Sequence, residues 1–217
     1  MAYKGVIFDL DGTLLYTLRD LTDSVNAALS RADLPTHDEE EYKYFVGDGV
    51  EELATRVLPE VRRNGEAIAK LVADIRREYS QRWADTTKPY DGIPELLDAL
   101  YARGIKMAIL SNKPDDSAQA TVTRLLDRWQ FDMVMGVGPS VPRKPDPTAA
   151  LQIARRMGIP PQEMLYVGDT DTDMKTAVAA GMYAVGVLWG YRTADELKAN
   201  GARVLVQQPG ELLCLLE

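Results

Sequence analysis

The chain has 217 residues, of which 46% are hydrophobic and 27% charged, so it can bury a core and is not disordered. Its length fits one domain with a sizeable insertion better than two full domains. Lys and Arg number 25 against 33 Asp and Glu, and the net charge of −8 disfavours nucleic acid or an anionic membrane as the partner. A single cysteine, Cys214, excludes an intramolecular disulfide, and a single histidine, His37, excludes a zinc site made of several histidines.

Neither a membrane span nor a secretion signal is expected. The longest uncharged stretch, 177–191, is interrupted by glycines and is shorter than the ~18 apolar residues of a membrane helix. The N-terminus leads into a short apolar run that ends in aspartate, not into a long apolar signal core. We therefore expect a cytoplasmic protein.

Strand and helix patterns alternate along most of the chain. A buried strand is expected at 6–8, and apolar residues at helical spacing over 15–82 predict a helical insert directly after it. The elements expected after the insert are, in order, helix 94–103, strand 105–110, helix from 115, strand 131–137, helix 147–157, strand 164–167, helix 173–180, strand 184–188, helix from 194 and strand 203–206. Because these strands are apolar throughout, they predict an α/β fold with a doubly wound, mostly parallel, Rossmann-like sheet. The predicted core is 1–14 with 83–217.

Polar clusters follow four of the expected core strands. The clusters are Asp9 to Thr13, Ser111 to Lys113, Arg143 to Pro147 and Gly168 to Asp173. Ligands of open parallel α/β sheets bind beyond the carboxyl ends of the strands. If the strands are neighbours, the four clusters form one site.

The acidic members of these clusters indicate a metal site. Asp9, Asp11, Asp169 and Asp173 would crowd together, and such like charges raise one another's pKa or require a compensating cation. Oxygen ligands without thiolate or imidazole suit Mg²⁺. The residues Asp171 and Thr172 are expected to be structural, as caps of the following helix.

The same clusters carry the groups needed for phosphoryl transfer. A carboxylate beside Mg²⁺ can attack phosphorus and form an aspartyl phosphate, and Asp9 follows the first strand directly. Asp11 can protonate the leaving oxygen and later activate water. The positive charge of Lys144 and the hydroxyl of Ser111 can bind the phosphate oxygens. The pattern Asp-x-Asp-Gly-Thr directly after an apolar strand is specific for such catalysis.

Taken together, these residues resemble the haloacid dehalogenase superfamily of phosphatases over nearly the whole chain. The four matching motifs are Phe8 to Leu14, Ser111-Asn112, Lys144-Pro145, and Gly168-Asp169 with Asp173. The resemblance implies that Asp9 is nucleophile and metal ligand, and that Asp11 is the acid/base, with its main-chain carbonyl on the metal. It implies that Asp169 binds the metal directly and Asp173 mainly indirectly. Substrate contacts are expected from Thr13, Ser111, Asn112 and Lys144, and the insert 15–82 is expected to be the α-helical cap domain.

Within the superfamily the chain is most similar to phosphoglycolate phosphatases. The stretch Gly47-Asp48-Gly49, followed by Leu53, Arg56 and Leu58, resembles their substrate-facing loop and helix, and so Gly47 and Arg56 are expected to bind substrate. The implied partner is a small phosphorylated metabolite. Two positions depart from the pattern. Tyr16 stands where relatives commonly carry aspartate, and Asp48 puts a negative charge in a loop expected to face an anion.

Other activities stay open at this point. A sugar-phosphate mutase would share all four motifs, but the loop 46–50 has no Lys or Arg for a second phosphate. A phospho-accepting signalling domain also combines aspartate, Mg²⁺ and lysine on a doubly wound sheet, but needs neither the helical insert nor an acid/base at position 11. The metal-free dehalogenases of the superfamily lack an aspartate at the position of Asp11. A monomer or a homodimer is expected.

Overall fold

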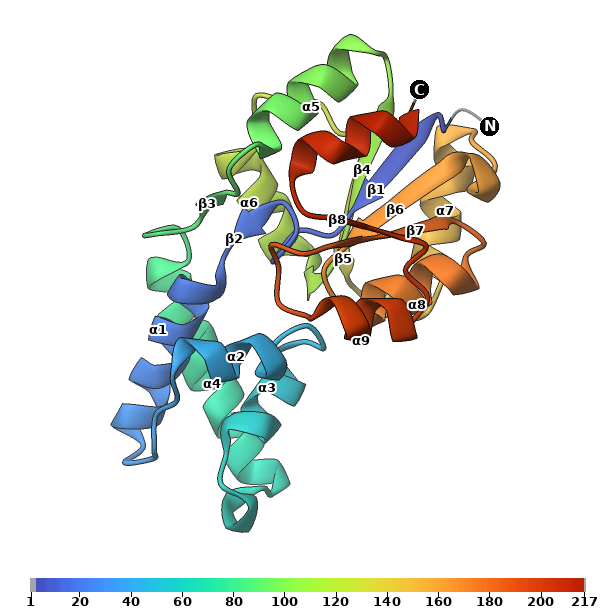
Figure 1. The fold of residues 1–217 in the computed structure, drawn as a ribbon. Helices are drawn as coiled ribbons and strands as arrows, with labels where there is room; N and C mark the ends of the chain where they lie inside the picture. Colours follow the sequence, from blue (N-terminus) through green and yellow to red (C-terminus); the bar gives the residue numbers. More distant parts are fainter. Residues whose placement is uncertain (1–2, 217) are drawn as a thin grey trace. The chain divides into compact units, whose positions relative to one another are not determined.

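The computed structural model describes residues 3–216, and the chain divides into two compact units (Figure 1). One unit runs up to Leu15 and continues from Pro89 onward, and the other is Tyr16–Lys88. The second boundary therefore falls later than the residue 83 expected from the sequence. The reason is the buried Asp20, whose carboxylate accepts hydrogen bonds of 2.6–3.0 Å from the N–H and hydroxyl groups of Thr86 and Thr87.

Within residues 3–216, six strands form one sheet in the order β5-β4-β1-β6-β7-β8, and every neighbouring pair is parallel. The strands are β1 Gly5–Phe8, β4 Lys106–Pro114, β5 Met133–Val137, β6 Met164–Gly168, β7 Tyr183–Val187 and β8 Val204–Val206. The strand order reverses direction at β1, which pairs with both β4 and β6. The predicted doubly wound parallel sheet is confirmed, and its switch point is where such folds bind ligands.

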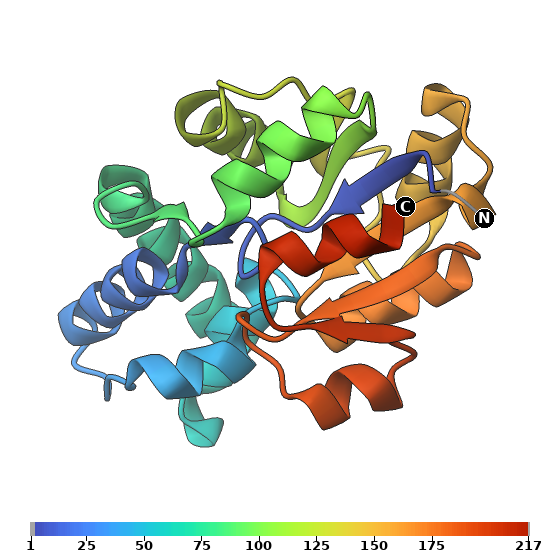
Figure 2. The same ribbon diagram turned by 45° about the horizontal axis from the view of Figure 1, so that its top comes forward.

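Helices cover both faces of this sheet, because successive strand residues point to opposite sides. In β1, Val6 and Phe8 pack toward one face and Ile7 toward the other. The first face is covered by α5 Ile93–Ala102, α6 Asp115–Leu125 and the 3₁₀ helix η3 Pro209–Leu216; the second by α7 Thr148–Met157, α8 Asp171–Ala179 and α9 Ala194–Ala199. Figure 2 shows α5 and η3 side by side.

One expected strand is longer than its apolar run. The sequence pattern placed its end at residue 110, but β4 continues through Ser111, Asn112 and Lys113 to Pro114, with an irregular register against β5 after Leu110. The second polar cluster thus belongs to the strand and shares its direction. This extension places Ser111 and Lys113 beyond the point where β1 ends.

The other unit is built from helices: α1 Leu18–Arg31, α2 Glu39–Phe45, α3 Val50–Val57, the 3₁₀ helix η1 Glu60–Arg62 and α4 Gly65–Arg82. Side-chain caps begin two of them, since Asp38 accepts from the Glu41 N–H of α2 and Asn64 from the Ala67 N–H of α4. Two paired segments connect the units, β2 Leu15–Tyr16 and β3 Lys88–Pro89. No helix among the described residues has the length and apolar character that a bilayer crossing requires.

Candidate active site

The predicted convergence of the polar clusters is confirmed. β4, β1 and β6 are neighbours, and their clusters follow the same edge of the sheet. Asp9 comes directly after β1, and its N–H donates to the carbonyl of Val167 in β6 at 2.9 Å. Three carboxylates, those of Asp9, Asp169 and Asp173, offer oxygens that all lie within 4.8 Å of one another, and all three residues are buried.

Lys144 joins two of these carboxylates. Its ammonium lies 2.8 Å from Asp9 Oδ1 and 2.7 Å from Asp173 Oδ1, and its side chain is 3% exposed. The backbone of Lys144 is held in turn by Asn112, whose Oδ1 accepts from the Lys144 N–H at 2.8 Å and whose Nδ2 donates to the Lys144 carbonyl at 3.2 Å. Asn112 therefore positions the lysine that the sequence identified.

Asp169 is held by groups from two segments that are far apart in the sequence, Gly12-Thr13 and Gly190-Tyr191. Its Oδ1 accepts from the Thr13 hydroxyl at 3.1 Å, and its Oδ2 accepts from the Tyr191 N–H at 2.9 Å. Gly12 has φ +87°, and a Cβ there would lie 2.4 Å from Asp169 Oδ2. A Cβ at Gly190 would lie 2.2 Å from the Asp169 Cβ. Glycine at both positions allows the backbone to close tightly around this carboxylate.

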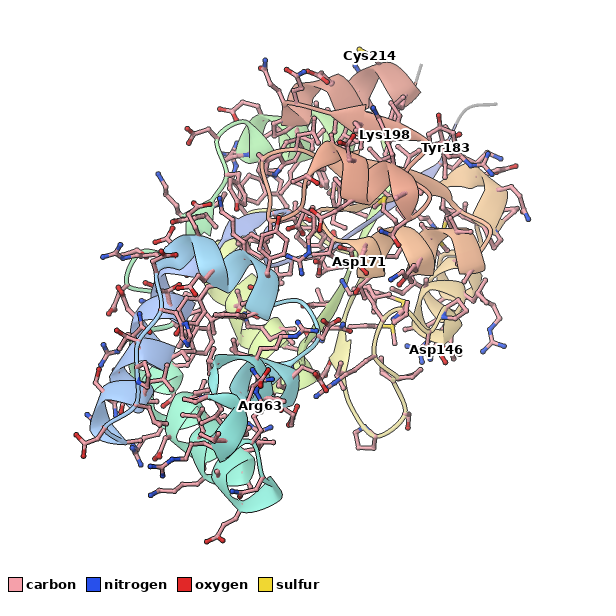
Figure 3. The ribbon with its side chains drawn as sticks, turned by 60° about the horizontal axis from the view of Figure 1, so that its bottom comes forward. Arg63, Asp146, Asp171, Tyr183, Lys198 and Cys214 are labelled. Carbon is pink, nitrogen blue, oxygen red and sulfur yellow. The ribbon has the colours of Figure 1, made fainter. Side chains whose placement is uncertain are left out.

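Asp173 belongs to the first turn of α8. The N-cap is Thr170, which forms a capping box with Asp173: the Asp173 N–H donates to Thr170 Oγ1 at 3.3 Å, and the Thr170 N–H donates to Asp173 Oδ2 at 3.1 Å. The Thr170 hydroxyl also donates to Asp173 Oδ2, at 2.6 Å. The expectation that Asp171 or Thr172 caps this helix was wrong, because both are already inside it. Asp171, labelled in Figure 3, instead pairs with Lys175 at 2.6 Å.

Burial and mutual repulsion set the electrostatics of the cluster. Burial, followed by the charge of Asp173, raises the pKa of Asp9 well above its usual range, although Lys144 opposes the rise. Burial and Asp173 also raise the pKa of Asp169 to about 7, against hydrogen bonds from Tyr191 and Thr13. Burial would lower the pKa of Lys144, but Asp173 and Asp9 hold it well above its ordinary value.

These residues fit a divalent metal ion. Three buried carboxylates against one buried ammonium leave two negative charges when all four groups are ionised. A cation with two positive charges would neutralise that excess, and oxygen ligands of this kind suit a hard cation such as Mg²⁺. The donor set thus agrees with the charge argument from the sequence.

Asp11 makes a separate ion pair. Its two carboxylate oxygens accept from the Lys113 ammonium at 2.8 and 3.0 Å. The Lys113 N–H donates to Ser111 Oγ at 3.2 Å, which ties Lys113 to the predicted phosphate-binding hydroxyl. The sequence placed Lys113 in a polar cluster without assigning it a role. Its position directly after Ser111 and Asn112 was the available signal.

The remaining predicted site residues, Gly47 and Arg56, lie in the helical unit. Arg56 Nη2 contacts Asp48 Oδ2 at 2.5 Å, and Nη1 donates to the carbonyls of Phe45 and Tyr44 at 3.1 and 3.4 Å. The charge of Asp48 is therefore neutralised within its own unit. Arg56 braces the loop between α2 and α3, and substrate binding by Gly47 and Arg56 stays a prediction.

The family profile of the haloacid dehalogenase-like hydrolases matches residues 6–187, which include all four polar clusters. The chain belongs to this family. It is 35% identical to a phosphoglycolate phosphatase of Chromobacterium violaceum, over 99% of this chain and 96% of that protein. It is 31% identical to a phosphoglycolate phosphatase of Shigella boydii, over 97% of this chain and 91% of that protein. A crystal structure from Lactobacillus delbrueckii subsp. bulgaricus superposes with a TM-score of 0.94 at 29% identity, covering 100% of this chain and 99% of that one. The resemblance found in the sequence motifs is thus confirmed at the level of the family.

Proposed function

We propose that this hydrolase is a Mg²⁺-dependent phosphatase that cleaves a small phosphomonoester through an aspartyl phosphate on Asp9. The observation that carries the proposal is the buried group formed by Asp9, Asp169, Asp173 and Lys144 at the switch point of the sheet. Its charge suits a divalent cation, and its place at the carboxyl ends of β1 and β6 suits a phosphate ligand. The curated relatives at 31–35% identity are phosphoglycolate phosphatases, which makes phosphoglycolate the first substrate to test.

In the first step, an oxygen of Asp9 attacks phosphorus while the bond from phosphorus to the ester oxygen breaks. Asp11 gives its proton to that leaving oxygen. In the second step, water gives a proton to Asp11 and attacks the phosphorus of the aspartyl phosphate. The bond to Asp9 then breaks, inorganic phosphate leaves, and both carboxyl groups return to their starting states.

The local contacts of Asp9 suit this role. Among residues 3–216, the donors that reach its carboxylate are the Lys144 ammonium and the Leu10 N–H, and both contact Oδ1. Oδ2 is thus the oxygen available for attack. Lys144 keeps the carboxylate in one orientation, and the Ser111 hydroxyl at the end of β4 can donate to a phosphate oxygen.

A magnesium ion would be held by the carboxylates of Asp9 and Asp169 and by the main-chain carbonyl of Asp11. Asp173 would act on it mainly indirectly, as expected from the sequence. When bound, it supplies positive charge to the phosphoryl oxygens during transfer. A cytoplasmic location and a monomeric or homodimeric state stay predictions.

A screen of phosphomonoesters with Mg²⁺, comparing kcat/KM, tests the proposal. Phosphoglycolate and other small alkyl phosphates should be turned over with sustained release of inorganic phosphate. Asp9→Asn, which is nearly isosteric, should fold and lose the activity, whereas the exposed control Asp23→Asn should keep it. The proposal fails if Asp9→Asn retains about a tenth or more of wild-type turnover, since removing a nucleophile costs orders of magnitude.

Sustained turnover also separates the alternatives considered from the sequence. A phospho-accepting signalling domain would take up a phosphoryl group once and release phosphate only slowly. A sugar-phosphate mutase would convert one sugar phosphate into its isomer without net phosphate release. Comparable efficiency on a phosphorylated protein would contradict the proposed preference for small substrates.

A further inference from the structure

We infer that Lys113 is a positioning residue for Asp11, an inference that rests on the proposed function. Two lysines lie at the candidate site, and each holds a different carboxylate. Lys144 contacts Asp9 and Asp173, whereas the Lys113 ammonium contacts both oxygens of Asp11. Lys144 thus contacts the proposed nucleophile, and Lys113 contacts the proposed acid/base.

The burial of Lys113 distinguishes this pair from an ordinary surface ion pair. A lysine usually extends its ammonium into solvent, and exposed pairs contribute little. The Lys113 side chain is 9% exposed, and the Asp11 side chain is 27% exposed. A shielded ammonium with two contacts to one carboxylate restricts that carboxylate strongly, because water cannot fully replace the lost contacts when the two groups separate.

The strand register explains how the two residues meet across 102 positions of sequence. β1 and β4 are parallel neighbours with Phe8 opposite Ile109, so Asp11, which follows β1, and Lys113, in the extension of β4, both lie past the end of β1 at the same edge of the sheet. The Lys113 N–H also donates to Ser111 Oγ. Lys113 therefore ties the acid/base to the same short segment that carries the phosphate-binding hydroxyl.

This tether has a direct consequence for catalysis. A proton donor must lie within hydrogen-bond reach of the leaving oxygen, and an aspartate side chain can otherwise turn among several rotamers. Without Lys113, Asp11 would spend less time in the orientation set by this contact. With an alkyl phosphate both steps should slow, whereas attack by Asp9 on a substrate whose leaving group needs no proton should not.

Lys113→Met tests the inference through the dependence of rate on the leaving group. For an alkyl phosphate, kcat/KM should fall about 10–100-fold, up to the cost of a misplaced catalytic group. For acetyl phosphate, whose leaving group needs little protonation, kcat/KM should change less than about 3-fold. The aspartyl phosphate should then accumulate with acetyl phosphate, and rapid quench followed by intact-mass measurement would detect it.

Three further variants separate positioning from other roles. In the Asp11→Asn background, Lys113→Met should have no additional effect, because its action passes through Asp11. Lys113→Arg, which keeps a two-pronged contact, should restore much of the activity on alkyl phosphates even if Lys113→Met is less stable. Lys175→Met, which removes a half-exposed lysine paired with Asp171, should behave like wild type.

Equal losses on both substrates, or additive effects in the Asp11→Asn background, would overturn the inference, because they mean that Lys113 acts on the phosphate or on the fold. Wild-type kinetics in Lys113→Met would overturn it too. If the wild-type protein itself fails to hydrolyse alkyl phosphates, the proposed function has failed. If the wild type is active and Asp9→Asn removes that activity, the proposed function holds. A negative result with the Lys113 variants then contradicts only the inference about Lys113.

Discussion

Replacing Lys144 with methionine should destabilise the metal-free protein, because the change removes one partner from two buried ion pairs. The ammonium lies 2.8 Å from Asp9 and 2.7 Å from Asp173, and its side chain is 3% exposed. Breaking a buried pair by removing one partner costs about 3–5 kcal/mol. Proton uptake by the stranded carboxylates limits the loss, so we expect about 3 kcal/mol, near the lower end of that range.

Thermal unfolding at neutral pH measures this loss. For a chain of this size, about 3 kcal/mol corresponds to a fall in Tm of about 6–12 °C. Lys175→Met, which removes a half-exposed ion pair, should shift Tm by no more than about 2 °C. Asp173→Asn added to Lys144→Met should cause no further loss, since the second change removes one of the stranded charges.

Magnesium should raise the Tm of Lys144→Met to about that of the metal-free wild type. A cation bound at about 100 times its dissociation constant adds about 2.7 kcal/mol, which nearly equals the expected loss. Phosphatase activity should stay absent, because the ammonium that orients Asp9 is missing. A Tm of Lys144→Met equal to that of Lys175→Met, without Mg²⁺, would refute the view that these ion pairs hold the site together.

Three other changes test separate parts of the structure. Asp11→Asn should lower kcat/KM on alkyl phosphates about 10²–10⁴-fold, while with acetyl phosphate it should trap a phosphorylated enzyme that intact-mass measurement detects; wild-type rates would make Asp11 a structural residue. Gly12→Ala should abolish activity and Mg²⁺-dependent stabilisation in thermal unfolding, because its Cβ would lie 2.4 Å from Asp169 Oδ2 at φ +87°; normal Mg²⁺ binding would contradict this. Burial opposes ionisation of Asp20, but hydrogen bonds from Thr86 and Thr87 hold the pKa of its carboxyl below the usual value. The ionised carboxylate therefore contributes to folding stability above pH ~3.9, and this contribution is lost as the pH falls through the lower pKa of the folded state. Urea unfolding should therefore show that Asp20→Asn is less stable than wild type by about 2–3 kcal/mol at pH 7 and by less at pH 3. An equal difference in the free energy of unfolding at both pH values would refute a stabilising role of the ionised Asp20 carboxylate.

Much of the core fold follows from local sequence patterns. Short apolar runs followed by polar clusters and amphipathic helices were enough to predict the parallel sheet, because buried strands and surface helices have different periodicities. The same reasoning found Asp9, Asp169 and Lys144, since residues at the ends of parallel strands share one edge. The hydrogen bonds between Asn112 and the Lys144 backbone join residues 32 positions apart and had no local signal.

The boundary of the helical insert shows where local patterns stop. Helical spacing ends near residue 82, but Asp20 binds the backbone and hydroxyls of Thr86 and Thr87 and keeps them with the helical unit. The leucines on both sides of Cys214 are a pattern typical of core packing, yet Cys214 is exposed on η3 (Figure 3). In both cases the packing of the folded chain, not the neighbouring residues in sequence, decides the environment of a side chain.

By itself the sequence determined the residue types of the site and the strands that deliver them, because a motif next to an apolar strand fixes which chemistry stands at which strand end. Only the tertiary structure decided which charges pair. The ammonium of a lysine lies at the end of a flexible four-carbon chain, so Lys113 and Lys144 could each have met either carboxylate. The parallel register of β1 and β4 brought Lys113 to Asp11, and the backbone contacts of Asn112 directed Lys144 between Asp9 and Asp173.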